Sequence, residues 1–163
     1  MAQLTLTRAI VLGAVLLILC PVPVSVMETD GTPVVRSQTV SWSSVGLGDK
    51  VTVLVFLEPD CAACVESMAF FKRLMTIPGL DGKAGRVVVI ARNGVIPVKD
   101  LIDAAGFKPH RLTSGPAGAA AAVQSVPAVL LLDGAGQRAG LWNGQLTEKQ
   151  QQEVTELITR RLG

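Results

Sequence analysis

The feature that most constrains this chain is a buried-strand pattern that leads directly into a pair of cysteines. Val51–Leu57 is a continuous run of mainly β-branched and aromatic side chains, which is typical of a strand covered on both faces. Pro59 ends the strand, because proline has no N–H to donate within a central sheet. From Cys61 to Met75 apolar residues recur at three- and four-residue spacing. The sequence therefore predicts a strand, a short turn, and a helix that begins at the first cysteine.

The two cysteines at the start of this helix have a spacing suited to disulfide exchange. Cys61 and Cys64 lie on nearly the same face, so their sulfur atoms can close a small disulfide ring. The unpaired N–H groups of a helix N-terminus favour an anion, and we expect them to lower the pKa of the Cys61 thiol. Because a thiolate is the attacking species, we predict that Cys61 is the nucleophile. Cys64, one turn deeper, is predicted to be the resolving thiol that releases a mixed disulfide.

Other uses of a cysteine pair fit the sequence less well. A zinc site needs two further ligands at suitable spacing, and only His110 and Cys20 remain. Haem attachment requires a histidine directly after the second cysteine, where Val65 stands. A structural disulfide, an inert buried pair and a copper-carrying dithiol stay open as alternatives. We predict no bound metal and no cofactor.

The rest of the chain alternates strand and helix patterns. Strands are predicted at residues 35–42, 86–91, 107–112, 128–132 and 137–142, and helices at 97–105, 116–123 and 147–162. Strands that alternate with helices run parallel, whereas the Asp133–Gly136 loop predicts an antiparallel hairpin. We therefore expect an α/β sandwich with helices on both faces of a mixed sheet.

Residues 1–27 have the pattern of a membrane anchor or a signal segment. Ala9–Met27 carries no charge and approaches the roughly 20 residues that a transmembrane helix needs. Arg8 precedes this stretch and acids follow it, so the positive-inside rule predicts a single pass of the cytoplasmic membrane. Residues 28–163 are then expected on the extracytoplasmic (periplasmic) side. A cleaved signal peptide and a lipoprotein anchored through Cys20 stay open as alternatives.

The remaining residues divide into a connecting segment and one domain. Residues 28–44 contain turn formers and a loosely alternating stretch, which predict a linker and an edge strand. Residues 45–163 are enough for one domain with its own hydrophobic core. A formal net charge of +2, no cluster of basic residues and 4% aromatic residues argue against a nucleic-acid partner.

From about residue 51 to residue 162 the chain resembles the thioredoxin superfamily. Three blocks carry the resemblance: Phe56–Cys64 at a strand-to-helix junction, Ser125–Ala128 before a strand, and Leu130–Gly140 with its hairpin turn. The resemblance implies a thioredoxin-like three-layer sandwich. It also implies that Pro127 is the family's cis-proline and that the backbone of Val126 pairs with a bound substrate.

Within the superfamily the Phe56–Cys64 block is similar to the membrane-anchored extracytoplasmic thiol:disulfide interchange branch, which includes cytochrome c maturation and methylamine-utilisation thioredoxin-like proteins. The resemblance implies a thiol-disulfide oxidoreductase acting on secreted or membrane-bound client proteins. It also leaves room for a membrane redox partner or a membrane complex.

The sequence departs from thioredoxin at several positions near the cysteines. Asp60 replaces the usual tryptophan, Ala62-Ala63 separates the cysteines, and Val55 stands where thioredoxin has a buried aspartate. Glu58 and Asp60 would oppose the effect of the helix N-terminus on Cys61. Two functions therefore stay open: an oxidoreductase, or a non-catalytic thioredoxin-like binding module of a larger membrane complex.

Overall fold

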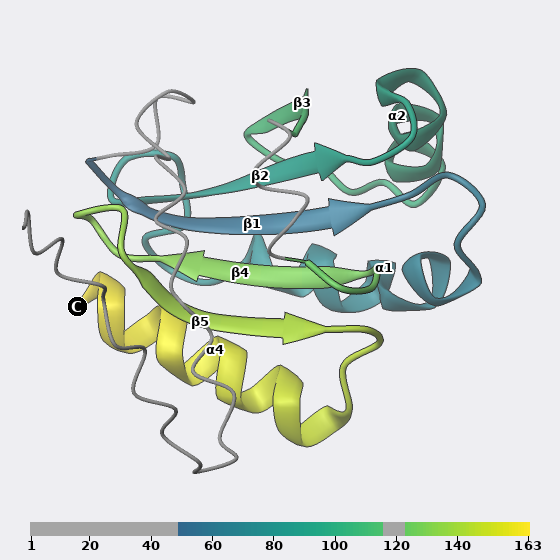
Figure 1. Cartoon of the computed structure of the whole chain (residues 1–163). Coiled ribbons are helices and arrows are strands. Elements are labelled where there is room, and N and C mark those ends of the chain that lie inside the picture. Colours follow the sequence, from purple (N-terminus) through teal and green to yellow (C-terminus); the bar gives the residue numbers. More distant parts are fainter. Residues whose placement is uncertain (1–48, 116–122) are drawn as a thin grey trace, which may run out of the picture. The chain divides into compact units, whose positions relative to one another are not determined.

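Eight regular elements build the part of the chain that this computed structural model describes, residues 49–115 and 123–163. In chain order they are β1 (Val51–Leu57), α1 (Ala62–Leu74), β2 (Gly85–Ala91), α2 (Val95–Ala104), β3 (Arg111–Ser114), β4 (Ala128–Leu132), β5 (Arg138–Asn143) and α4 (Glu148–Leu162). A short loop joins β1 to α1 (Figure 1). Cys61 is the N-cap of α1, and Cys64 lies in its first turn.

β1 lies at the centre of a five-stranded mixed sheet with the order β3-β2-β1-β4-β5 (Figure 1). β2 runs parallel to β1, and β3 runs parallel to β2. β4 is antiparallel to β1 and forms a hairpin with β5. All seven residues of β1 are buried, because the strand has a neighbour at each edge and packed side chains on both faces. The mixed sheet predicted from the sequence is confirmed.

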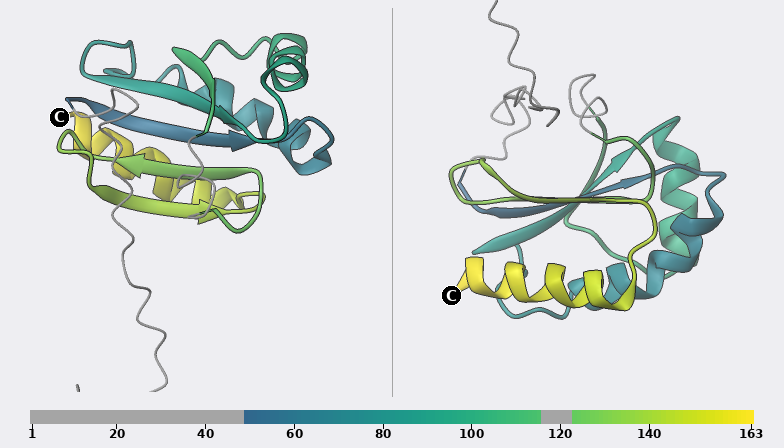
Figure 2. Two further views of the ribbon diagram at one scale, coloured as in Figure 1. Left: turned by 45° about the horizontal axis from the view of Figure 1, so that its top comes forward. Right: turned by 60° about the horizontal axis from the view of Figure 1, so that its bottom comes forward.

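Alternate strand residues build two hydrophobic clusters, one on each face of the sheet. Val55 of β1 belongs to the first cluster, to which α1, α2 and α4 all contribute buried side chains. Figure 2 shows α1 and α4 on one side of the sheet. Leu54 belongs to the second cluster, which within the described ranges includes Val123 and no helical residue. Most of the helix expected at 116–123 lies outside the described residues, so a helix on this second face stays a prediction.

The helices begin and end close to their predicted positions. α1 starts one residue after Cys61, which serves as its N-cap. α2 starts at Val95, two residues earlier than expected, after Gly94 with φ 119°. Pro97 therefore lies in the first turn, where its missing N–H removes no bond within the helix.

One strand begins later than its sequence pattern suggested. We expected residues 107–112, whereas β3 spans Arg111–Ser114. The backbone N–H of Phe107 donates to the carbonyl of Ile102 at 2.9 Å and so closes the end of α2. The Phe107 ring is buried and lies 6.2 Å from the ring of Phe71. This residue therefore belongs to a helix end that packs into the core, and the strand starts after it.

α4 begins with a capping box that the sequence pattern predicted. The Thr147 hydroxyl accepts the Gln150 N–H at 3.3 Å, and the Gln150 side chain accepts the Thr147 N–H at 2.9 Å. We expect Thr147→Ala to lower the free energy of unfolding by about 1 kcal/mol, because a helix N–H loses its partner. Urea titration followed by circular dichroism measures this, with Thr159→Ala, at an exposed position in the last turn of the same helix, as the control. A Thr147→Ala loss no larger than that of the control would contradict the assigned cap.

The N-terminal predictions fall outside the described residues. They comprise the anchor or signal segment (1–27) and the linker with its edge strand (28–44), and both stay predictions. Among the helices of residues 49–115 and 123–163, none combines the length and apolar character needed to cross a bilayer.

Candidate functional site

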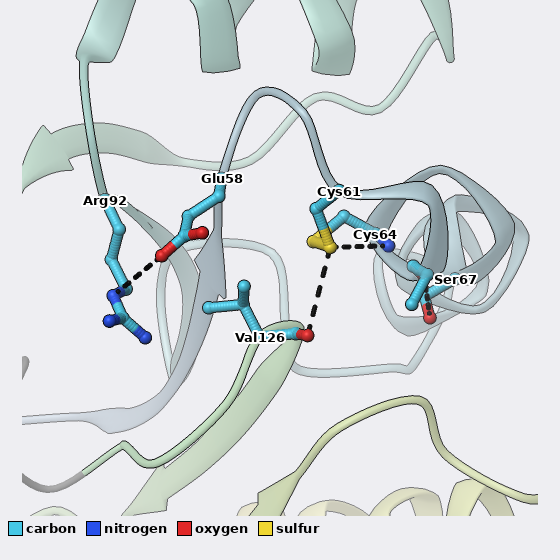
Figure 3. Close-up of a disulfide and its surroundings, with 7 residues drawn as sticks. Glu58, Cys61, Cys64, Ser67, Arg92 and Val126 are labelled. Atoms are coloured by element: carbon cyan, nitrogen blue, oxygen red, sulfur yellow. Dashed lines mark hydrogen bonds and ion pairs between the residues drawn. A yellow bond between two sulfur atoms is a disulfide. The ribbon is translucent and has the colours of Figure 1, made fainter.

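Cys61 and Cys64 are joined in a disulfide at the N-terminus of α1 (Figure 3). Their Cα atoms are 5.1 Å apart, a separation within the ordinary range for a disulfide. Cys61 has extended backbone angles because it precedes the first helical residue, whereas Cys64 lies within the first turn. The spacing of three residues thus allows the ring to close without unwinding the helix.

The Cys61 sulfur occupies the position of a helix-capping acceptor. The backbone N–H of Cys64 donates to it at 3.1 Å, and no acidic residue lies in the first turn of α1. After reduction this N–H and the end of the helix dipole would face a thiolate and stabilise its charge. The sequence led us to expect backbone N–H groups of the helix N-terminus near the Cys61 sulfur, and the structure contains such a contact.

The two sulfur-bearing residues differ in their access to solvent. Cys64 is 0% exposed, whereas Cys61 is only partly buried. A client sulfur can approach Cys61 from outside, while Cys64 can reach it only from within the protein. This asymmetry suits an attacking residue and a resolving residue, although those roles themselves stay predictions.

The loop before β4 brings Val126 and Pro127 to the same place. The Val126 carbonyl oxygen points toward the Cys61 sulfur (Figure 3) and lies 3.8 Å from it. The Val126–Pro127 peptide bond is cis. The antiparallel register pairs Phe56 with Ala128, so the residues before β4 lie beside the end of β1. Residues more than 60 positions apart therefore meet at the disulfide. A role for this loop in substrate binding stays a prediction.

A partly buried ion pair lies at the base of the loop that carries Cys61. Glu58 follows β1, Arg92 follows β2, and their side chains meet at 3.1 Å (Figure 3). The sequence led us to expect Glu58 to act against the helix N-terminus at Cys61, whereas its side chain is 25% exposed and paired with Arg92. The sequence analysis did not single out Arg92. Both strand patterns end just before a charged residue, Glu58 after Leu57 and Arg92 after Ala91, and this could have suggested the pair.

His110 lies apart from this site. Its Nδ1 accepts the backbone N–H of Val87 at 3.0 Å, near the start of β2, whereas the disulfide lies beyond the carboxyl end of β1. Within residues 49–115 and 123–163 no three His, Cys, Asp or Glu side chains gather in a way that could hold a metal ion.

Comparison with known proteins finds similarity in structure but not in sequence. No protein-family model matches the chain, and no curated protein sequence matches it. Similar solved structures include a thiol:disulfide interchange protein of the thioredoxin family from Chlorobium tepidum, with 17% identity, a TM-score of 0.58 and coverage of 74% of this chain and 85% of that one. A thiol-disulfide isomerase from Corynebacterium glutamicum has 18% identity, a TM-score of 0.56 and coverage of 74% and 85%.

A third similar structure is a secreted Mycobacterium tuberculosis disulfide oxidoreductase, described as homologous to E. coli DsbE. It has 18% identity, a TM-score of 0.54 and coverage of 71% of this chain and 85% of that one. All three are thiol–disulfide proteins, and at these identities the likeness establishes the fold. This chain therefore has a thioredoxin-like fold, which it shares with these three thiol–disulfide proteins.

Proposed function

We propose that this chain is an extracytoplasmic thiol-disulfide oxidoreductase that exchanges disulfides with secreted or membrane-bound client proteins. One observation carries the proposal: the partly exposed Cys61 sulfur caps α1 while the buried Cys64 is bonded to it from inside. A purely structural disulfide needs neither the helix-capping contact nor an accessible sulfur. A solved protein with the same fold is described as a thiol:disulfide interchange protein, and this supports disulfide exchange as the proposed reaction.

The exchange uses two displacement steps at sulfur. In the reducing direction the Cys61 thiolate attacks a client disulfide, forming a mixed disulfide and releasing one client thiolate. Cys64 then loses its proton to solvent, and its thiolate attacks the Cys61 sulfur. The mixed disulfide breaks, the second client thiolate leaves, and the Cys61–Cys64 disulfide remains. Two electrons pass to the client, and the reverse sequence oxidises a client dithiol.

Val126 is suited to hold the client during the first step. Its carbonyl oxygen lies 3.8 Å from the Cys61 sulfur, so a backbone N–H flanking the client cysteine can donate to it. Pro127 is buried and anchors this carbonyl at the start of β4. Substrate recognition through backbone groups would tolerate many client sequences, because every residue except proline carries an N–H.

The extracytoplasmic location is part of the proposal and depends on the N-terminal segment. Residues 1–27 would insert as a single-pass anchor or act as a signal, leaving the thioredoxin-like domain outside the cytoplasm, where disulfides persist. A similar solved protein is described as secreted, which agrees with this location.

A trapping experiment with the full chain tests the proposal. In Cys64→Ser the mixed disulfide cannot be resolved, so tagged protein from intact cells should carry clients in bands that dithiothreitol removes. The Cys61→Ser/Cys64→Ser chain is the matched control and should carry none. Membrane proteins that copurify equally with both variants, without dithiothreitol-sensitive bands, would refute exchange and favour the non-catalytic subunit.

A further inference from the structure

Glu58 and Arg92 are placed side by side by the two central parallel strands. Leu57 and Ala91 are partners in the register, and the Arg92 N–H donates to the Leu57 carbonyl at 2.8 Å. The next side chains along each strand therefore emerge at the same edge, where Arg92 Nε meets Glu58 Oε1 at 3.1 Å. In Figure 3 the Glu58 carboxylate points toward Arg92 and away from the sulfur atoms.

The acids nearest to Cys61 along the chain are Glu58 and Asp60, in the turn that leads into α1. The first turn of α1 has no acid, and Glu66 further along is bonded to Gln145 at 2.8 Å. Residues 115–127, which precede β4 and include Val126, contain no charged side chain. Asp60 is exposed, so water and salt screen it. Glu58, three residues before Cys61 and 25% exposed, is the more shielded of the two acids in this turn.

A carboxylate in that position would act against the chemistry of Cys61. A nearby negative charge disfavours a second one, so an unpaired Glu58 would raise the proton affinity of the Cys61 thiolate. Arg92 removes this effect in two ways, by its opposite charge and by turning the carboxylate away from the sulfur. We propose that Arg92 is a positioning residue that acts through Glu58 to keep Cys61 reactive as a thiolate.

This inference deepens the proposed function, because it bears on the direction of exchange. In glutathione buffer the protein disulfide takes two electrons from two glutathione molecules, giving the dithiol and one glutathione disulfide. A group that stabilises the Cys61 thiolate stabilises the dithiol state and makes the protein a stronger oxidant. By offsetting the charge of Glu58, Arg92 thus biases the site toward accepting electrons from client dithiols.

The test is the pH dependence of Cys61 alkylation by iodoacetamide in the reduced full chain, followed by mass spectrometry of the Cys61 peptide. Arg92→Met should raise the pKa of Cys61 by about half a unit to one unit, a roughly three- to tenfold higher proton affinity. Glu58→Gln should lower that pKa, and Glu58→Gln/Arg92→Met should lie near the wild type. In glutathione buffer Arg92→Met should shift the equilibrium toward the disulfide.

Two further variants separate this role from a structural one. Arg92→Lys keeps the charge and should retain most of the wild-type value. Arg86→Met removes another paired arginine, which lies at the opposite end of β2, about 20 Å from Arg92. This variant should leave the pKa of Cys61 unchanged. Shifts of the same sign in the two single variants, or a double variant equal to Arg92→Met, would overturn the proposal. Alkylation needs no client, so a failed insulin assay with these shifts intact would count against the proposed function alone.

Discussion

The Cys61→Ser chain is expected to catalyse no reduction of insulin by dithiothreitol above the uncatalysed rate. A serine hydroxyl at the N-terminus of α1 stays protonated at neutral pH and cannot accept a sulfur–sulfur bond, so the first displacement is lost. Insulin turbidity measured with the full chain in detergent records this loss. The expected effect is complete because Cys64 is 0% exposed and cannot replace Cys61 as the attacking residue.

The matched control is Cys20→Ser, which makes the same substitution at the third cysteine of the chain. We expect this variant to keep the wild-type rate, because the proposed exchange uses only Cys61 and Cys64. Equal insulin reduction by the wild type and Cys61→Ser would eliminate the oxidoreductase reading for this client. Loss of activity in Cys20→Ser alone would point to a different reactive thiol.

Phe71→Ala is expected to lower the free energy of unfolding by about 3–5 kcal/mol. The Phe71 side chain is 1% exposed, and its ring packs between those of Phe70 at 5.8 Å and Phe107 at 6.2 Å. Its removal leaves a cavity between α1 and the residue that closes α2, and the surrounding rings cannot fill it without leaving their own contacts. Guanidinium titration of the oxidised protein measures the change.

Ile96→Ala is the control for this second prediction. Ile96 is also a large apolar residue on a helix, yet it is 74% exposed, so its truncation should change stability by about 0.5 kcal/mol or less. A Phe71→Ala loss below about 1 kcal/mol would contradict the described packing of α1. Similar losses in the two variants would likewise place Phe71 at the surface.

Much of the site's chemistry could be read from the chain without coordinates. Three features involve residues only a few positions apart: the run of β-branched and large apolar residues in β1, the helical spacing after Cys61, and the capping box at Thr147. Local hydrogen bonding and burial decide such features, so composition and spacing suffice to predict them. The family resemblance added Pro127, whose peptide bond with Val126 is cis in the structure.

Other features depended on which strands became neighbours. Pairing of β1 with β4 brings the Val126 carbonyl to Cys61, and pairing of β1 with β2 brings Arg92 to Glu58. The sequence indicates where each strand ends, but strand order and register, which make Glu58 and Arg92 neighbours, are properties of the folded sheet. The late start of β3 has the same origin, since Phe107 packs into the core and closes a helix instead of joining the sheet.

The sequence by itself determined that a cysteine pair begins a helix after a buried strand, because three-residue spacing and apolar periodicity act within one or two turns of chain. The tertiary structure alone decided what surrounds that pair: a carbonyl 65 residues away and an ion pair joining two strand ends. The physical reason is that a thiolate responds to every charge and dipole within several ångströms, whichever part of the chain supplies it.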